Sequence, residues 1–556
     1  MAGLCEGGNE LAGSLKAISG YCQKISKELV RVIKKAIIRV KVGEAVIAIM
    51  SNDEKLVVKS VHLYPLENGK LHHTDKFEML HQETPRAILR RAQPFHLVVN
   101  FSGRGYDPEK DSVQLIFSYG LRPNVIKGTK GVSTVTEKKT EDENAWYARL
   151  VGKDESSMNV EVRSPPDTPV GLWKFQIETR PKDDPSAKPK SFTYDDKIYI
   201  LFNPWAKTMK GEVLNISAGD QVYMSDERLL DEYVLSDVGK IWVGPYNSSR
   251  GREWVYGQFD DAVLPAIDLM LSRTNVAPVN RGNPIYVTRA ISKIVNSNDS
   301  DMGVLTGRWD GKYEDGTPPA AWTGSVPILE EYLETQNEVK YGQCWVFAGV
   351  VTTVCRALGI PCRPVSNLVS AHDANASLTI DRYYDTEMEL LDFDPTNPEG
   401  EDSIWNYHVW NDVWMARPDL PKGYGGWQAI DATPQETSDA AQLERNEFLN
   451  ILSYFFVFAQ CRSDAFNGQG SIPGLVVMEF LVDKANVIKR VYQCGPASVE
   501  AVKCGVIGFN YDVSFLLSTV NADLVRWKED TTDPNNYAKI DSNKYQTIEA
   551  GYEQYY

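Results

Sequence analysis

Long hydrophobic runs are missing from this chain of 556 residues. Its most apolar window, FLNILSYFFVFAQC at 448–461, is shorter than the roughly 20 residues that a membrane-spanning helix needs. Positive charge is also in deficit, because 59 Lys and Arg face 75 Asp and Glu and leave a net charge of -16. A chain this acidic repels a phosphate backbone. The sequence therefore predicts no transmembrane segment and no nucleic-acid partner.

Cysteine is sparse as well, with 8 residues scattered at positions that lack the spacing of zinc ligands. So few cysteines in so long a chain do not form the dense framework of a disulfide-stapled secreted domain. The N-terminal MAGLCEGGNELAG has neither the basic region nor the apolar region of a secretory signal. These absences predict a reducing, cytoplasmic location.

The length is too great for one compact core, so two or more domains are expected. Residues 1–54 are expected to form an N-terminal extension. Its segment KELVRVIKKAIIRVKV favours either a basic amphipathic helix with a membrane-surface or partner-helix role, or a local helix or poorly ordered leader. From 55 to 200, short β-branched and aromatic runs alternate with Pro, Gly and Asp, which is typical of an antiparallel β-sandwich. From 201 to 556, helical patterns mix with strands and indicate an α+β domain.

One segment of the second domain, YGQCWVFAGV at 341–350, places Cys344 directly before an apolar run. Apolar residues recur at helical spacing as far as Leu358, and Gly359 with Pro361 supplies a stop, so a mostly buried helix is predicted. Cys344 would then lie at a helix N-terminus, where the dipole and the unpaired N–H groups favour a thiolate. A cysteine at a helix start is more often a packing residue. Both interpretations stay open at this point.

A base for such a nucleophile has few candidates, because only His372 and His408 lie in the same domain as Cys344. His408 lies in SIWNYHVWNDVW, which alternates like a strand, and a turn-rich link leads to a second short strand that carries Asp431. Two strands joined in this way pair antiparallel, which would set the Asp431 carboxylate beside the His408 ring. Singly, His408 could be a satisfied core histidine and Asp431 a cap for the turn before Pro434. Together with Cys344 they have the papain-like layout of a catalytic triad.

Tryptophan is frequent around these segments. Four tryptophans predict an aromatic wall around the nucleophile: Trp345, Trp405, Trp410 and Trp414. Such a wall would keep water away from the thiol, which would be a handicap for a hydrolase.

The same segments resemble the active-site segments of the eukaryotic transglutaminases: YGQCWVFAGV, and SIWNYHVWNDVWMARPDLPKGYGGWQAIDATPQE almost throughout. The resemblance continues through GVLTGRWDGKYEDGTPP, VYQCGPASVEAVKCG and VNADLVRW, and it covers roughly 55–437 and 490–530. It implies that Cys344 is the nucleophile, that His408 is the general base and acid, and that Asp431 orients the imidazole.

Further roles follow from the resemblance alone. Trp309 matches the tryptophan whose indole N–H, with the backbone N–H of Cys344, stabilises the oxyanion; without the family it would be taken for a core aromatic. Trp345 and Trp405 match walls of a substrate tunnel. The implied reaction is an acyl transfer from a protein glutamine side chain, through a cysteine thioester, to a lysine or polyamine amine. Water in place of the amine would give deamidation.

Calcium is the implied cofactor, bound by oxygen-bearing side chains at three places. The matching positions are Asp373, Asn375, Ser377 and Asp402 at the first place, Asn296, Asn298 and Asp301 at the second, and Asn521 at the third. An extra residue at the second place leaves Ser300 as an alternative to Asp301. Without the family, the first two places would be ordinary Asx-rich turns.

The sequence departs from the family pattern in three ways. The two C-terminal β-barrels of the family have no counterpart in it, and the glutamates that complete the third calcium site are missing with them. An insert at 438–489 separates TPQETSD from VYQCGPAS, and TMKGEVLNISAG at 208–219 lengthens a loop. Regulation through the barrels and through a bound nucleotide is therefore left open.

The expected fold is multidomain, with an immunoglobulin-like β-sandwich followed by a papain-like α+β transglutaminase core, and C-terminal barrels absent. The expected function is that of a calcium-dependent protein-glutamine gamma-glutamyltransferase. Two rivals remain: a structural scaffold that has lost activity, and a papain-like protease or deamidase. The complete triad opposes the first rival, and the GQCW context with its aromatic wall opposes the second. Export by an unconventional route, which the family resemblance also allows, is kept beside the cytoplasmic location.

Overall fold

The computed structural model describes Lys34 and residues 55–544, except for gaps at 139–141, 143, 208–218, 298–301, 376, 393, 396–401, 435–493, 507–510 and 521. Within these residues, no helix is both long enough and apolar enough to cross a bilayer. The expected N-terminal extension at 1–54, Lys34 excepted, and the insert at 438–489 lie outside the described residues.

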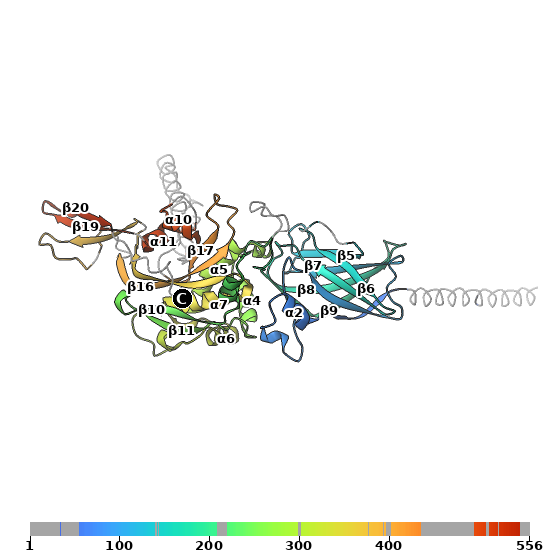
Figure 1. The fold of residues 1–556 in the computed structure, drawn as a ribbon. Coiled ribbons are helices and arrows are strands. Elements are labelled where there is room, and N and C mark those ends of the chain that lie inside the picture. The colour runs from blue at the N-terminus through green and yellow to red at the C-terminus, as the bar shows by residue number, and fades with distance from the viewer. Residues whose placement is uncertain are drawn as a thin grey trace, which may run out of the picture.

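The N-terminal part is built from nine strands in the order β1-β3-β7-β6-β5-β4-β8-β9-β2 (Figure 1). Its elements are β1 (Val57–His62), α2 (Pro65–Leu71), η1 (Glu78–Leu80), β2 (Ile88–Arg90), β3 (Phe95–Ser102), β4 (Asp111–Ser118), β5 (Lys130–Thr136), β6 (Tyr147–Lys153), β7 (Ser157–Arg163), β8 (Gly171–Pro181) and β9 (Lys190–Leu201). Side chains along β3 and β8 alternate between buried and more exposed, so each strand turns one face to a shared core. The order divides into two sheets, β1-β3-β7-β6 and β4-β8-β9-β2, with β5 between them. Strand β5 connects the two, because it pairs with β4 along most of its length and with β6 at only two positions. The predicted sandwich is confirmed.

The second part surrounds helix α7 (Cys344–Leu358), of which every residue is buried. A four-stranded antiparallel sheet, β14-β16-β17-β18, lies beside this helix. Its strands are β14 (Cys362–His372), β16 (Ser403–Met415), β17 (Gly426–Asp431) and β18 (Cys494–Ser498). The other elements of this part are α3 (Glu227–Leu230), η2 (Asp231–Leu235), β10 (Val238–Val243), η3 (Tyr246–Ser248), β11 (Arg250–Val255), α4 (Val263–Arg273), η4 (Pro278–Gly282), α5 (Pro284–Val295), β12 (Leu305–Gly307), η5 (Pro319–Ala321), α6 (Val326–Thr335), β13 (Val339–Gly342), α10 (Val499–Lys503) and α11 (Val513–Val520). This mixture is the α+β architecture that was predicted.

A small three-stranded sheet, β15-β19-β20, projects from the side of this core that faces away from the sandwich (Figure 1). It consists of β15 (Thr379–Tyr384), β19 (Asp523–Asp530) and β20 (Asp533–Lys544). Its base packs on the core through Ala371, Ile380 and Ala522, with Ile404 beside them. Since Ile404 belongs to β16, the small sheet rests directly on the strand that carries His408.

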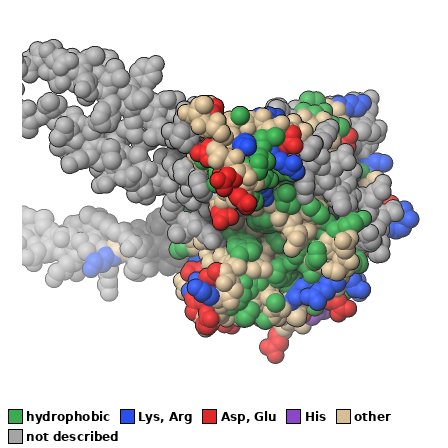
Figure 2. Space-filling model, turned by 90° about the vertical axis from the view of Figure 1, so that its left-hand side faces the viewer, with side chains coloured by type: hydrophobic (Ala, Val, Ile, Leu, Met, Phe, Trp, Pro, Cys, Tyr) green, Lys and Arg blue, Asp and Glu red, His purple; other side chains and the backbone are tan. Residues whose placement is uncertain are grey.

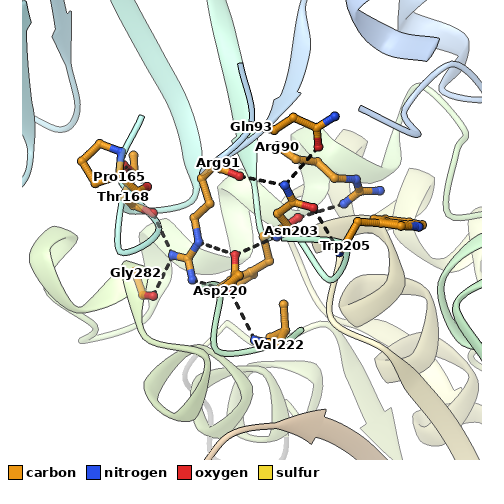
Figure 3. Close-up of polar contacts among 11 residues, drawn as sticks. Arg90, Arg91, Gln93, Pro165, Thr168, Asn203, Trp205, Asp220, Val222 and Gly282 are labelled. Carbon is orange, nitrogen blue, oxygen red and sulfur yellow. Dashed lines mark hydrogen bonds and ion pairs between the residues drawn. The ribbon is translucent and has the colours of Figure 1, made fainter. Parts of the chain in front are cut away.

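A buried ion pair joins the sandwich to the core (Figure 3). Arg91, which directly follows β2, places Nε 2.6 Å and Nη2 2.8 Å from the two carboxylate oxygens of Asp220. The side chains are 1% and 0% exposed, respectively. Nη1 of Arg91 also donates to the carbonyl oxygens of Thr168 and Gly282, and the backbone N–H of Asn203 donates to Asp220 at 2.8 Å. All of these groups are satisfied, so the pair can stay charged without water.

Candidate active site

Helix α7 begins at Cys344 because Gln343, in an extended conformation, is its N-terminal cap. The predicted stop is confirmed at the other end, where Gly359 takes φ 88°, a left-handed conformation that suits glycine. Cys344 is only 5% exposed and lies at the positive end of this 15-residue helix. The sequence thus folds into an element that fixes the thiol at a buried, polarised position.

Strands β16 and β17 bring His408 and Asp431 together. They pair antiparallel, with Asn411 opposite Ile430, as was predicted for these two segments. His408 Nε2 lies 2.6 Å from Asp431 Oδ2, and both side chains are almost fully buried. The other oxygen of Asp431 accepts from the N–H of Thr433 at 2.9 Å, so this residue also caps the turn.

The ring of His408 is held in its protonated form. Burial by itself would lower the pKa of His408, but the charge of Asp431 and the hydrogen bonds that the ring makes to Asp431 and Cys344 raise it to about 10. The Cys344 side chain therefore meets an imidazolium whose other side is fixed by a carboxylate. A cysteine sulfur, an imidazolium and a carboxylate in this order are equipped for nucleophilic attack and for proton transfer to a leaving group.

The protonation of His408 predicts a pH-dependent stability. The pKa in the folded protein, about 10, exceeds the ordinary value of 6.5, so the stabilisation is complete below pH 6.5 and is lost as the pH rises through 10. Unfolding free energies of the protein and of His408→Gln, measured by denaturant titration, should differ most near pH 6.5 and converge by a few kcal/mol towards pH 10. The control is His96→Gln, which removes a histidine from an exposed position of the sandwich. A constant difference for His408→Gln would show that Asp431 does not hold the proton on the ring.

A pocket of about 370 Å³ opens over Cys344. Its lining residues are Trp309, Gln343, Cys344, Trp345, Ile404, Trp405, Asn406 and Tyr407. On the face of the core in Figure 2, hydrophobic side chains gather in a hollow with charged side chains around its rim. Burial and the neighbouring Cys344 raise the pKa of Tyr407, so its hydroxyl stays neutral beside the thiol. The walls of the pocket are therefore largely aromatic, and none of its lining residues is a Lys, Arg, Asp or Glu.

The predicted aromatic wall needs a correction. Trp345 and Trp405 line the pocket, but Trp410 and Trp414 do not. Trp410 is buried in a separate apolar cluster on the sheet, and the indole N–H of Trp414 donates to the carbonyl of Tyr223. Strand β16 is covered on both faces, so its tryptophans are distributed between two cores.

Trp309 is 46% exposed at the pocket, so its interpretation as a core aromatic is wrong. Its ring lies over Gly307, where a Cβ atom would come within 2.7 Å of the indole. Any larger residue at 307 would displace the ring, because a real Cβ atom does not approach so closely. The glycine thus sets the position of Trp309 above the pocket.

Gln343 links the loop that carries Trp309, residues 308–313, to the start of α7. The sequence did not indicate this role. We call this segment the Trp309 loop. Its Nε2 donates to the carbonyl of Arg308 and to the hydroxyl of Tyr313, both at 3.0 Å. The N–H of Arg308 donates in turn to the carbonyl of Gly342 at 3.2 Å. The residue before Trp309 is therefore tied on both sides to the residues before Cys344, and we call these contacts the Gln343 clamp.

The first predicted calcium place is a tight loop next to β16. Oδ1 of Asp373 accepts from the N–H groups of Asn375 and Ser377, and the two oxygens of Asp402 accept from those of Ala374 and Asp381. These are the contacts of an Asx-rich turn. In the described ranges, no three His, Cys, Asp or Glu side chains are arranged to hold a metal ion.

The same loop crowds negative charge, which bears on its fit to calcium. The pKa of Asp402 is raised to about 6, chiefly by burial and also by the charges of Asp373 and Asp381, while backbone hydrogen bonds from Asp381 and Ala374 oppose the rise. A divalent cation would relieve that repulsion, and carboxylate, amide and hydroxyl oxygens are the donors that calcium prefers. The donor set therefore fits the cation chemically, although its oxygens accept from the loop's own N–H groups in this structure.

The other predicted calcium positions are mostly not described. Asn296 is fully buried and caps the C-terminus of α5. Asn298, Asp301 and Asn521 lie outside the described residues. The second and third places therefore stay predictions.

Two family models match the chain: one described as Transglutaminase family at residues 59–180, and one described as Transglutaminase-like superfamily at residues 312–432. The hemocyte protein-glutamine gamma-glutamyltransferase of Tachypleus tridentatus is 42% identical over 504 residues, which cover 89% of this chain and 56% of that protein. The human coagulation factor XIII A chain is 38% identical over 476 residues, which cover 85% of this chain and 49% of that one. The crystal structure of red sea bream transglutaminase superposes with a TM-score of 0.65 at 31% identity, covering 87% of this chain and 61% of that chain. The chain spans about half the length of the curated relatives that it matches.

Proposed function

Because this chain belongs to the transglutaminase family, we propose that it is a calcium-dependent protein-glutamine gamma-glutamyltransferase. The observation that carries the proposal is the contact of Cys344 with a His408 ring that Asp431 holds at 2.6 Å, under a pocket walled by tryptophans. The names of the similar proteins favour glutamine as the acyl donor. The proposed acceptors are protein lysines and polyamines.

The first half-reaction forms a thioester. The Cys344 thiolate attacks the side-chain carbonyl carbon of a protein-bound glutamine and forms a C–S bond, and the C–N bond breaks as the amide nitrogen takes the proton of the His408 imidazolium and leaves as ammonia. The backbone N–H of Cys344 at the start of α7 and the indole N–H of Trp309 are the proposed donors to the oxyanion. A His408 ring with a pKa of about 10 is protonated at neutral pH and can therefore act as the acid.

The second half-reaction transfers the acyl group to an amine. A lysine or polyamine nitrogen attacks the thioester carbon, its proton passes to His408, and the Cys344 sulfur leaves. The product is an isopeptide bond. The apolar walls Trp345 and Trp405 favour an amine with an aliphatic stem over water, because they offer water few hydrogen-bonding partners.

Calcium is proposed to act at the Asp373 loop. Asp373, Asn375, Ser377 and Asp402 would hold the ion, which would neutralise the carboxylates crowded there. Asp402 directly precedes β16, the strand that carries Trp405 and His408. Binding of the ion to the loop would thus affect, through β16, the position of Trp405 in the wall of the pocket.

The test of this proposal is incorporation of a fluorescent primary amine into a glutamine-rich protein. The full chain should incorporate the amine when calcium is present and lose nearly all of that activity when calcium is chelated and magnesium is supplied instead. Release of ammonia without incorporation would favour a deamidase. No reaction at all from the folded protein, with calcium present, would favour the scaffold.

The Gln343 clamp gives a prediction about turnover. Gln343→Ala removes both hydrogen bonds that tie the Trp309 loop to α7, so the oxyanion donor loses its fixed position. We expect kcat to fall by about 10- to 100-fold with little change in KM, and stability to fall by about 1 kcal/mol. Steady-state amine incorporation and thermal unfolding measure these effects. Gln82→Ala, at an exposed glutamine of the sandwich, should change neither, and an unchanged kcat for Gln343→Ala would show that the clamp does not position Trp309.

A further inference from the structure

The turn between β4 and β5 exposes aliphatic side chains at its tip. Leu121, Ile126 and Val125 are 101%, 96% and 61% exposed, respectively, more than any other large hydrophobic side chain that the structure describes. Single exposed hydrophobic residues are ordinary on protein surfaces, but here the three most exposed ones share one turn of the sandwich. We call residues 121–127 the apolar turn.

The apolar turn is held in shape by its own backbone. The carbonyl of Asn124 accepts from the N–H groups of Thr129 and Lys130, and the Asn124 side chain accepts from the N–H of Lys127. The Thr129 hydroxyl accepts from the N–H of Asn124 at 2.9 Å, and the N–H of Gly128 donates to the carbonyl of Val125 at 3.0 Å. The exposed side chains therefore project from a pre-organised support, and little conformational entropy is lost when they bind.

Basic residues stand between the aliphatic ones. Arg122 and Lys127 belong to the apolar turn, and Lys130 begins β5. In the part of the chain that the structure describes, none of the three forms an ion pair with a carboxylate. This local positive charge stands out in a chain with a net charge of -16.

We propose that the apolar turn docks this protein on an anionic phospholipid surface, with Leu121, Val125 and Ile126 inserted among the acyl chains and Arg122, Lys127 and Lys130 at the phosphates. A projecting aliphatic tip needs a soft apolar medium to enter, and a bilayer supplies it directly beside negative headgroups. A sulfated polysaccharide would satisfy the basic side chains and leave the aliphatic ones in water. The inference concerns the sandwich and is independent of the transfer chemistry.

The position of the turn determines which part of the protein a bound membrane would hold in place. Gly120, at the base of the turn, packs against Pro278 of the core, with 3.4 Å between its ideal Cβ position and the proline ring. The base therefore lies at the junction of sandwich and core. A bilayer that holds the tip would hold the core near the same surface, where glutamine-bearing membrane proteins could reach it.

Co-sedimentation of the full chain with vesicles tests the proposal. We expect binding to phosphatidylcholine vesicles that contain phosphatidylserine, and weak binding to phosphatidylcholine alone. The double variant L121D/I126D should lower the partition coefficient by about a hundredfold or more, and R122Q/K127Q should lower it by roughly thirtyfold. Val151→Asp is the matched control, because Val151 is an exposed aliphatic residue of the same sandwich, and it should bind like the unmodified chain. Amine incorporation and thermal unfolding should be unchanged in the two double variants, which shows that they fold.

Three outcomes would overturn the proposal. One is absence of binding of the unmodified chain to either vesicle. Another is retained binding by folded L121D/I126D, which would assign the affinity to another segment, such as the basic and apolar residues at 1–54. The third is loss of binding by R122Q/K127Q together with unchanged binding by L121D/I126D, which would indicate a purely electrostatic contact without insertion.

Discussion

Cys344→Ala is expected to abolish amine incorporation, with a loss of at least about 10⁴-fold in kcat. The thiol is the group at the start of α7 that contacts the His408 ring, and an alanine methyl cannot form a thioester. The fold should persist, since the change removes a single sulfur from a residue that borders the pocket. A quenched-reaction experiment with a labelled glutamine peptide should trap an acyl-enzyme with the unmodified chain and none with the variant.

Cys355→Ala provides the matched control in the same helix. Cys355 is fully buried and does not line the pocket, and burial raises its pKa well above the ordinary value. The control should keep full incorporation while losing a modest amount of stability from the small void. Incorporation that survives Cys344→Ala, or that is lost equally in Cys355→Ala, would contradict the assignment of the nucleophile.

Asp220→Ala is expected to have the largest effect on stability, at about 3 to 5 kcal/mol. The change leaves the Arg91 guanidinium buried at 1% exposure without its carboxylate (Figure 3). It also removes the acceptor for the N–H groups of Asn203 and Val222. Denaturant unfolding followed by tryptophan fluorescence measures the loss, and the sandwich and core are expected to unfold in separate steps once the pair is broken.

An exposed ion pair serves as the control that isolates the effect of burial on the stability loss. Asp196 binds Arg86 at 3.1 Å with both side chains about one-third exposed, so Asp196→Ala should cost less than about 1 kcal/mol. Replacing both Arg91 and Asp220 by leucine should recover part of the stability lost in Asp220→Ala, because no buried charge is then left alone. Equal losses in Asp220→Ala and Asp196→Ala would show that the buried pair does not lock the two domains.

The parts of the fold that sequence reasoning reached are those with local or regular signals. Helix α7 repeats apolar residues at helical spacing and ends at a glycine, so its start at Cys344 followed directly. His408 and Asp431 lie on strands joined by a turn-rich link, and neighbouring antiparallel strands bring such residues together. The family resemblance then connected these positions to a reaction.

The parts that it missed depend on contacts between distant side chains. The Gln343 clamp joins residues 343 and 308, and neither end carries a periodic signal. Alternation places Trp410 and Trp414 on the side of β16 opposite to Trp405, but on a strand covered on both faces it does not decide which side meets the pocket. Asp220 stands just after a segment that was taken for a lengthened loop, and nothing in its neighbourhood indicates an arginine 129 residues earlier.

That separation of 129 residues has a consequence for synthesis on the ribosome. The last strand of the sandwich, β9, ends at Leu201, so the strands of the sandwich leave the ribosome before the partner of Arg91 does. Until then, the cation at the end of β2 keeps its water, and the face that will meet the core stays hydrated. Arrival of Asp220 removes that water and joins a finished domain to an unfinished one. The Arg91–Asp220 pair thus couples the folding of the sandwich to the folding of the core, so that the two domains behave as one cooperative unit.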